Sequence, residues 1–227
     1  MKGFLQFAAI GAMLSAVTTF LLWLLPKFYP EISTFDDQVA LHTNGFYLGR
    51  LWINFIHIFF AVTGYAGVAV ILFREKPGFA LLGLIAFLGW GFTELLGVSG
   101  LIWAVNGTWR SAYSTADEAT QAVLSQLIES FTSQWVAWYF LLLVFFLIGT
   151  LCYGLGLWRS AGLAQWVSIL LLLAVPLTIF IMISGYGGPA WPGLVASWVY
   201  PALQPLSRLM LGWWIWRMSY QPSRLHG

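Results

Sequence analysis

The chain has 227 residues, of which 60% are hydrophobic and only 8% carry a charge. Soluble domains carry about 25% charged residues, so this chain has too few charges to cover a surface in water, and lipid must surround most of it. Its net charge of +2 is too small to indicate nucleic-acid binding. The single cysteine, Cys152, excludes an internal disulfide.

Six apolar stretches are long enough to cross a membrane. A spanning helix needs about 20 apolar residues, because in lipid each backbone polar group must be paired within its own segment. The first stretch, residues 4–25, follows Lys2 as a signal peptide would, but it is too long for one, so we expect a retained helix. The other five are residues 51–73, 79–105, 135–157, 163–184 and 194–216. The sequence predicts an all-α fold, a single transmembrane domain over residues 1–227 that forms a bundle of six helices.

Positive charges predict the orientation of this bundle. If both termini are cytoplasmic, six Lys or Arg residues lie inside and three lie outside, with Arg208 left within a span. Cytoplasmic loops carry an excess of Lys and Arg, so this bias favours a topology with both termini inside (N-in, C-in). The six inner residues are Lys2, Arg74, Lys76, Arg159, Arg217 and Arg224.

Two outer loops carry signals for helices. At Ser33 and Thr34, a hydroxyl is followed three residues later by an acid, which predicts a capped helix start, and Asn44-Gly45 is predicted to end that helix. The same pattern recurs at residues 114–118, where the helix is predicted to run on into the fourth span. The outer loops are therefore expected to be structured.

Ionisable residues at membrane depth mark candidate sites, because a charge in hydrocarbon is costly. Glu94 falls near the middle of the third span, where it must be protonated, paired or in contact with water. Arg50, Asn54 and His57 follow one another at i, i+4 and i+7, so they share one face of the second span and descend from its outer end. Alternatively, Arg50 anchors the helix at the headgroups, and the other three only fasten helices together.

The sixth span contains two prolines four residues apart. Pro201 and Pro205 each remove a backbone donor, so residues 200–205 are expected to be kinked or partly unwound, with Gln204 among them. Broken helices at membrane depth are tolerated only against protein or a wet cavity.

Arg208 follows one turn after Gln204 in this span. We hypothesise that it pairs with Glu94 and that His57 lies beside the same carboxyl, since the depths are similar. The alternative is that Arg208 extends to the headgroups.

A short motif raises an enzymatic alternative. Residues 97–100 read Gly-Val-Ser-Gly, which matches the GxSG signature of intramembrane serine proteases of the rhomboid type. That pattern places the serine in the fourth span and its histidine partner in the sixth, whereas here Ser99 lies in the third span and the sixth has no histidine. Ser99 could still meet His57, but small residues more simply allow close helix packing. We expect no catalytic residues.

The length, the six spans, Arg50 at the start of the second span and the ending PLSRLMLGWW at residues 205–214 resemble a family of bacterial multi-pass membrane proteins known only as a domain of unknown function. The resemblance covers nearly the whole chain. It implies no activity.

The sequence thus predicts a multi-pass protein of the bacterial cytoplasmic (inner) membrane, in contact with membrane lipids. We expect an outward-opening polar pocket that binds a small or lipid-like ligand, for transport or sensing. The alternative is a structural or accessory subunit of a larger membrane complex. No nucleic-acid partner, cofactor or metal site is expected. The residues predicted to line the pocket are Arg50, Asn54, His57, Glu94, Gln204 and Arg208.

Overall fold

The computed structural model describes residues 1–190 and 195–221, with the backbone alone described for residues 196 and 197. Within these ranges the chain is helical with short connections and contains no strand, which confirms the predicted all-α class. Two predicted features lie outside the described residues: position 194, where the sixth span was expected to begin, and Arg224 in the tail.

Among the described residues, five helical segments are long and apolar enough to cross a membrane, which supports a multi-pass membrane protein. Each overlaps one of the first five predicted stretches. Two of them consist of more than one element, because a 3-10 turn or a π-helical segment continues the α-helix. The segments are α1 (Lys2–Leu24) with η1 (Leu25–Phe28), α3 (Gly45–Leu72), α4 (Pro77–Ser99) with the π-helical η3 (Gly100–Arg110) and α5 (Ser111–Tyr113), α6 (Glu118–Leu157), and α7 (Leu163–Gly185).

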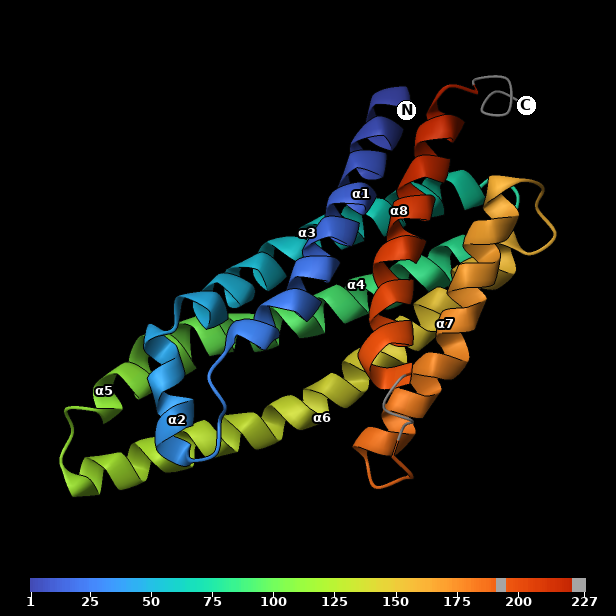
Figure 1. Cartoon of the computed structure of the whole chain (residues 1–227). Coiled ribbons are helices and arrows are strands. Elements are labelled where there is room, and N and C mark those ends of the chain that lie inside the picture. The colour runs from blue at the N-terminus through green and yellow to red at the C-terminus, as the bar shows by residue number, and fades with distance from the viewer. Residues whose placement is uncertain (191–194, 222–227) are drawn as a thin grey trace.

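The last helix, α8 (Tyr200–Ser219), lies antiparallel to α1 (Figure 1). At one end the Gln6 amide donates to the Tyr220 hydroxyl at 3.0 Å, and at the other the Trp23 and Trp198 ring centroids are 5.7 Å apart. The N-terminal end of α1 and the C-terminal end of α8 therefore lie together. With 20 residues, α8 is about 30 Å long, but its polar residues make it less apolar than the other five segments.

The predicted break at residues 200–205 lies one turn earlier than expected. The backbone is π-helical over η4 (Val195–Val199) and regular from Tyr200 onward. Pro201 falls in the first turn of α8, where the missing N–H costs no helical hydrogen bond, and Pro205 is accommodated inside the helix.

Small residues allow α1, α3 and α8 to pack closely. A Cβ atom added to Gly67 of α3 would lie 2.6 Å from the Ala8 Cβ of α1, and one added to Gly212 of α8 would lie 2.9 Å from the Ala9 carbonyl oxygen. Real side chains do not approach so closely, so glycine is needed at both positions. Small residues at helix contacts are typical of membrane proteins.

A buried aromatic cluster joins α3, α4 and α6. The Tyr65 and Phe87 rings stack with centroids 3.5 Å apart, and the Tyr153 hydroxyl donates to the Tyr65 carbonyl at 3.0 Å. Tyr153 and Phe87 have no exposed surface. This cluster gives the second half of the bundle its core.

The two loops predicted to be outer contain helices, as expected. Thr34 caps α2 (Phe35–Ala40) in a capping box with Asp37. The 3-10 turn η2 (Leu41–Thr43) continues α2 and ends at Asn44, as predicted, and the Asn44 side chain also accepts from the Tyr47 N–H to begin α3. In the second loop the cap is Asp117 rather than Ser114 or Thr115, and α6 runs from there for 40 residues without a break. In Figure 1, α2, α5 and the start of α6 gather at the end far from the termini.

Candidate functional site

Two predicted site residues from different helices meet inside the bundle. The Arg208 guanidinium of α8 contacts His57 Nε2 of α3 and donates from the same nitrogen to Thr19 Oγ1 of α1 at 3.0 Å. His57 and Arg208 are 3% and 6% exposed, so neither reaches the headgroups. The Trp90 ring lies 5.8 Å from the guanidinium carbon, within cation–π range.

These contacts fix the protonation state of His57. Arginine can only donate hydrogen bonds, so His57 Nε2 must be an acceptor that carries no proton. The other ring nitrogen, Nδ1, lies 2.7 Å from Thr18 Oγ1, and the Thr18 hydroxyl donates to the Leu14 carbonyl at 3.0 Å. His57 is therefore the neutral tautomer with its proton on Nδ1, and it leaves the charge of Arg208 uncompensated.

Glu94 of α4 lies near the same group of residues but does not bind Arg208 directly. The Arg208 guanidinium contacts Thr19 and His57 and lies beside the Tyr65 hydroxyl, whereas Asn54 is the side chain beside the Glu94 carboxyl. Arg208 and Arg50 act on Glu94 electrostatically. The hypothesis of a direct pair with a nearby histidine is thus replaced by a wider arrangement, in which two cations face one acid.

The charge of this arrangement is positive. Glu94 is the one acidic residue of the chain that falls within a predicted span. Arginine is a cation in proteins, so the two arginines Arg50 and Arg208 against the single acid Glu94 leave one positive charge over. Three donors, Arg50 Nε, Gln204 Nε2 and Arg208 Nε, are buried without a hydrogen-bond partner, as are the acceptor Asn54 Oδ1 and the Tyr29 hydroxyl beside Arg50, which can donate or accept. Buried polar groups in proteins are nearly always satisfied, so these donors favour a further acceptor.

Glu94 and two tyrosines near it keep accessible surface. Glu94 and Tyr200 are half-buried, and Tyr139 is 39% exposed.

The structure thus places five of the six predicted residues in mutual contact or electrostatic reach, on α3, α4 and α8. The sixth, Gln204, lies one turn before Arg208 on the buried face of α8 and is 8% exposed. On α3, Arg50 and Asn54 are half-buried and His57 is buried.

Sequence reasoning missed the partners that α1 supplies. Ser15, Thr18 and Thr19 are spaced i, i+3 and i+4 in an otherwise apolar helix. That spacing places three hydroxyls on one face of the helix, and it could have predicted that this face contacts the polar residues.

A second buried arginine, Arg110, is the last residue of η3. Arg110 is 7% exposed and donates to the Tyr47 hydroxyl at 3.1 Å and to Asn106 Oδ1 at 3.0 Å. Asn106 in turn donates to the Leu101 carbonyl, five residues earlier. A π-helical segment of 11 residues is unusual, and such segments are frequent at functional sites.

The GxSG motif serves packing. A Cβ at Gly97 would overlap the Trp135 ring, and one at Gly100 would overlap the Phe131 ring, so both glycines admit aromatic side chains of α6. His57 uses its ring nitrogens on Thr18 and Arg208. Nothing in this geometry activates Ser99. No group of three or more His, Cys, Asp or Glu side chains placed to hold a metal occurs among the described residues.

Comparisons with known proteins give no relative. No family model, no curated protein and no solved structure matches the chain. The resemblance to a bacterial membrane family of unknown function stays a prediction, and function has to be argued from the residues themselves.

Proposed function

We propose that this protein crosses the membrane of a bacterial cell six times, with both termini in the cytoplasm and α8 as the sixth span. Three observations support this topology. The end of α8 lies beside the start of α1, α8 has the length of the hydrocarbon core, and Lys2, Arg74, Lys76 and Arg159 would share the cytoplasmic side. A cysteine at Ser114 should then label from outside the cell and one at Ser160 only after permeabilisation.

The function we propose is the binding of an anionic small or lipid-like molecule in an outward-opening pocket, for transport or sensing. The single observation that carries this proposal is the uncompensated positive charge around Glu94. Arg208 is buried against a neutral His57, and Arg50 adds a second cation on the path from the outer end. A carboxylate, sulfonate or phosphate would supply both the missing negative charge and the missing acceptors.

In this proposal Glu94 supplies a negative charge in the empty pocket, and the ligand replaces that charge when it binds. Two guanidiniums without any acid would repel each other strongly at low dielectric, so an empty pocket needs Glu94 ionised. When an anion enters, Glu94 is free to take up a proton or turn to water in the proposed pocket. Ligand binding would therefore be coupled to a proton, which is a frequent arrangement where acids lie inside membrane proteins.

A test of the pocket is labelling by a membrane-impermeant thiol reagent. In a Cys152→Ala background, Asn54→Cys should react with reagent added from the outside. Phe59→Cys is the matched control on the same helix, because Phe59 is 51% exposed but should face lipid rather than water. If Asn54→Cys is as unreactive toward the reagent as Phe59→Cys, no hydrated path reaches Asn54, and the proposed pocket is wrong.

The accessory-subunit alternative makes a different prediction for the purified protein. A stoichiometric protein partner that survives purification from native membranes, together with an unreactive Asn54→Cys, would favour it. A copurifying acidic small molecule or lipid that is lost in Arg208→Gln would favour the pocket.

A further inference from the structure

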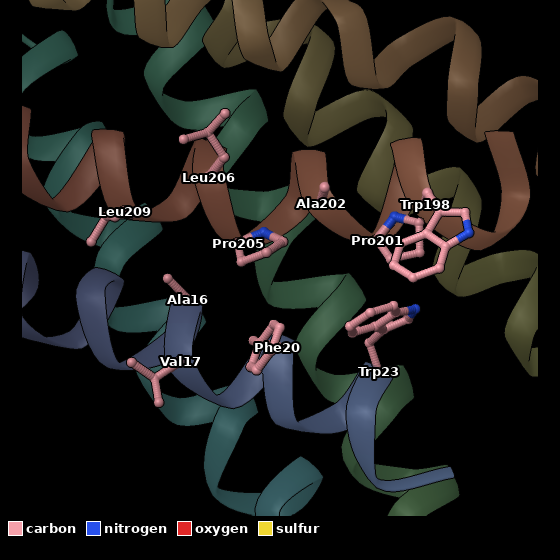
Figure 2. Close-up of a pocket in the computed structure, with 10 residues that line it drawn as sticks. All are labelled: Ala16, Val17, Phe20, Trp23, Trp198, Pro201, Ala202, Pro205, Leu206 and Leu209. Atoms are coloured by element: carbon pink, nitrogen blue, oxygen red, sulfur yellow. The ribbon is translucent and has the colours of Figure 1, made fainter. Parts of the chain in front are cut away.

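A groove runs between α1 and α8 (Figure 2), and none of the residues of the polar cluster lines it. Its volume is about 530 Å³, and apolar side chains from both helices line it. On α8 the lining residues Pro201, Pro205 and Leu209 recur at helical spacing. Gln204 and Arg208 are buried and are not among the residues that line the groove. The groove is therefore separate from the proposed pocket.

The groove has the depth of one membrane leaflet. Its lining extends from Trp198 of η4 to Leu209 of α8, which is eleven helical steps or about 16 Å at 1.5 Å per residue. The hydrocarbon core is about 30 Å thick, so the groove covers about half of it. Its walls present no charged residue, which fits a hydrocarbon chain and does not fit a polar ligand.

A positive charge lies at one end of the groove only. The Lys27 ammonium lies 3.5 Å from the Trp23 ring centroid and 4.9 Å from that of Trp198, and these two indoles line the groove at that end. Figure 2 shows both rings there, far from Leu209. Trp and Lys residues at the end of a span mark the headgroup level, and an exposed lysine is a point charge suited to phosphate.

We propose that this groove binds one acyl chain of an anionic glycerophospholipid, with the lipid phosphate on Lys27. An apolar groove one leaflet deep that ends at a cation matches such a lipid in shape and complements its negative charge. A zwitterionic lipid would fill the groove equally well, but its own ammonium would repel Lys27. With the proposed topology, the lipid belongs to the outer leaflet of that membrane.

Native mass spectrometry of the full chain in detergent tests this proposal. The probes are phosphatidylglycerol and phosphatidylcholine with identical chains, titrated separately. We expect phosphatidylglycerol to bind more tightly. Lys27→Gln should weaken its binding about fivefold, the effect of about 1 kcal/mol for one basic residue at a membrane surface, and should leave phosphatidylcholine unchanged. Ala202→Phe, which fills the groove, should weaken both.

Two controls match these variants. Lys2→Gln removes a lysine that also lies over an aromatic ring, 4.5 Å from the Tyr220 centroid, but lines no part of the groove. Leu173→Phe enlarges an exposed apolar side chain on α7. Neither should alter lipid binding.

The competing outcomes are distinct. If phosphatidylglycerol binds no better than phosphatidylcholine, or if its advantage survives Lys27→Gln, the proposal is wrong. If Arg208→Gln abolishes the advantage while Lys27→Gln does not, the headgroup lies in the polar pocket, and the groove proposal fails while the proposed function stands.

Discussion

Replacement of Gly67 by alanine tests the packing that brings α1 and α3 together behind the site. The added Cβ would lie 2.6 Å from the Ala8 Cβ and 3.2 Å from Ile215 Cδ1. Carbon atoms in contact are about 3.5–4.0 Å apart, so α1 and α3 would have to separate by about 1 Å. The Ala8 methyl group cannot rotate away, since it is fixed to the backbone of α1.

The size of the effect follows from a comparison within α3. Alanine is favoured over glycine in a helix by about 1 kcal/mol, and this gain applies at any helical position. Gly49 has no atom within 4 Å of an added Cβ, so Gly49→Ala carries the gain alone. Overpacking costs about 1–3 kcal/mol, so Gly67→Ala should be less stable than Gly49→Ala by about that amount.

Reversible unfolding in mixed micelles measures both free energies of unfolding under the same conditions. The displaced α1 also carries Thr18 and Thr19, so Gly67→Ala should disturb the contacts of His57 and Arg208 as well. Equal stabilities of the two variants would refute the close approach of α1 to α3 and, with it, the position of the hydroxyls in the site.

Three further predictions concern other parts of the fold. Tyr153→Phe should lower the free energy of unfolding by about 1 kcal/mol, because it removes the buried hydrogen bond to the Tyr65 carbonyl; an unchanged value would contradict that bond. Lys76→Met should lower it by about 0.3–1 kcal/mol, since the ammonium donates to the Gly156 carbonyl at the C-terminal end of α6, and the same unfolding assay should detect the loss. Hydrogen bonds from Thr34 and Ser33 lower the pKa of Asp37 to about 2, below its ordinary value, so the cap of α2 is complete above about pH 4 and is lost as the pH falls toward 2. Amide hydrogen exchange in α2, corrected for intrinsic rates, should rise over that range, and Asp37→Asn should show the raised exchange already at pH 6.

Much of the fold was predictable because length and apolarity alone decide whether a segment can lie in hydrocarbon. The first five apolar segments followed from this rule, and the helical signal at residues 114–118 predicted the continuous helix α6. The cap at Thr34 was predictable because it depends on residues three apart. Asn44 ends the helical stretch that follows Thr34, as predicted, and it also begins α3, since asparagine favours both the end and the start of a helix.

The site was only partly predictable, because it depends on how helices rotate about their axes. Helical spacing placed Arg50, Asn54 and His57 on one face, but it could not choose Thr18 over Glu94 as the partner of His57. Arg110 could not be placed, since a π-helical segment shifts every later side chain relative to an α-helix.

The central claim is that the polar cluster is a hydrated site with a surplus of positive charge. The most direct measurement compares two thiosulfonate reagents, one bearing a sulfonate and one bearing a trimethylammonium group, in their rates of reaction with Asn54→Cys. Each rate is divided by the rate of the same reagent at a cysteine that replaces the exposed Ser114. We predict that the anionic reagent is favoured and that Arg208→Gln removes the preference. A preference for the cationic reagent, or identical ratios with and without Arg208, would contradict the account.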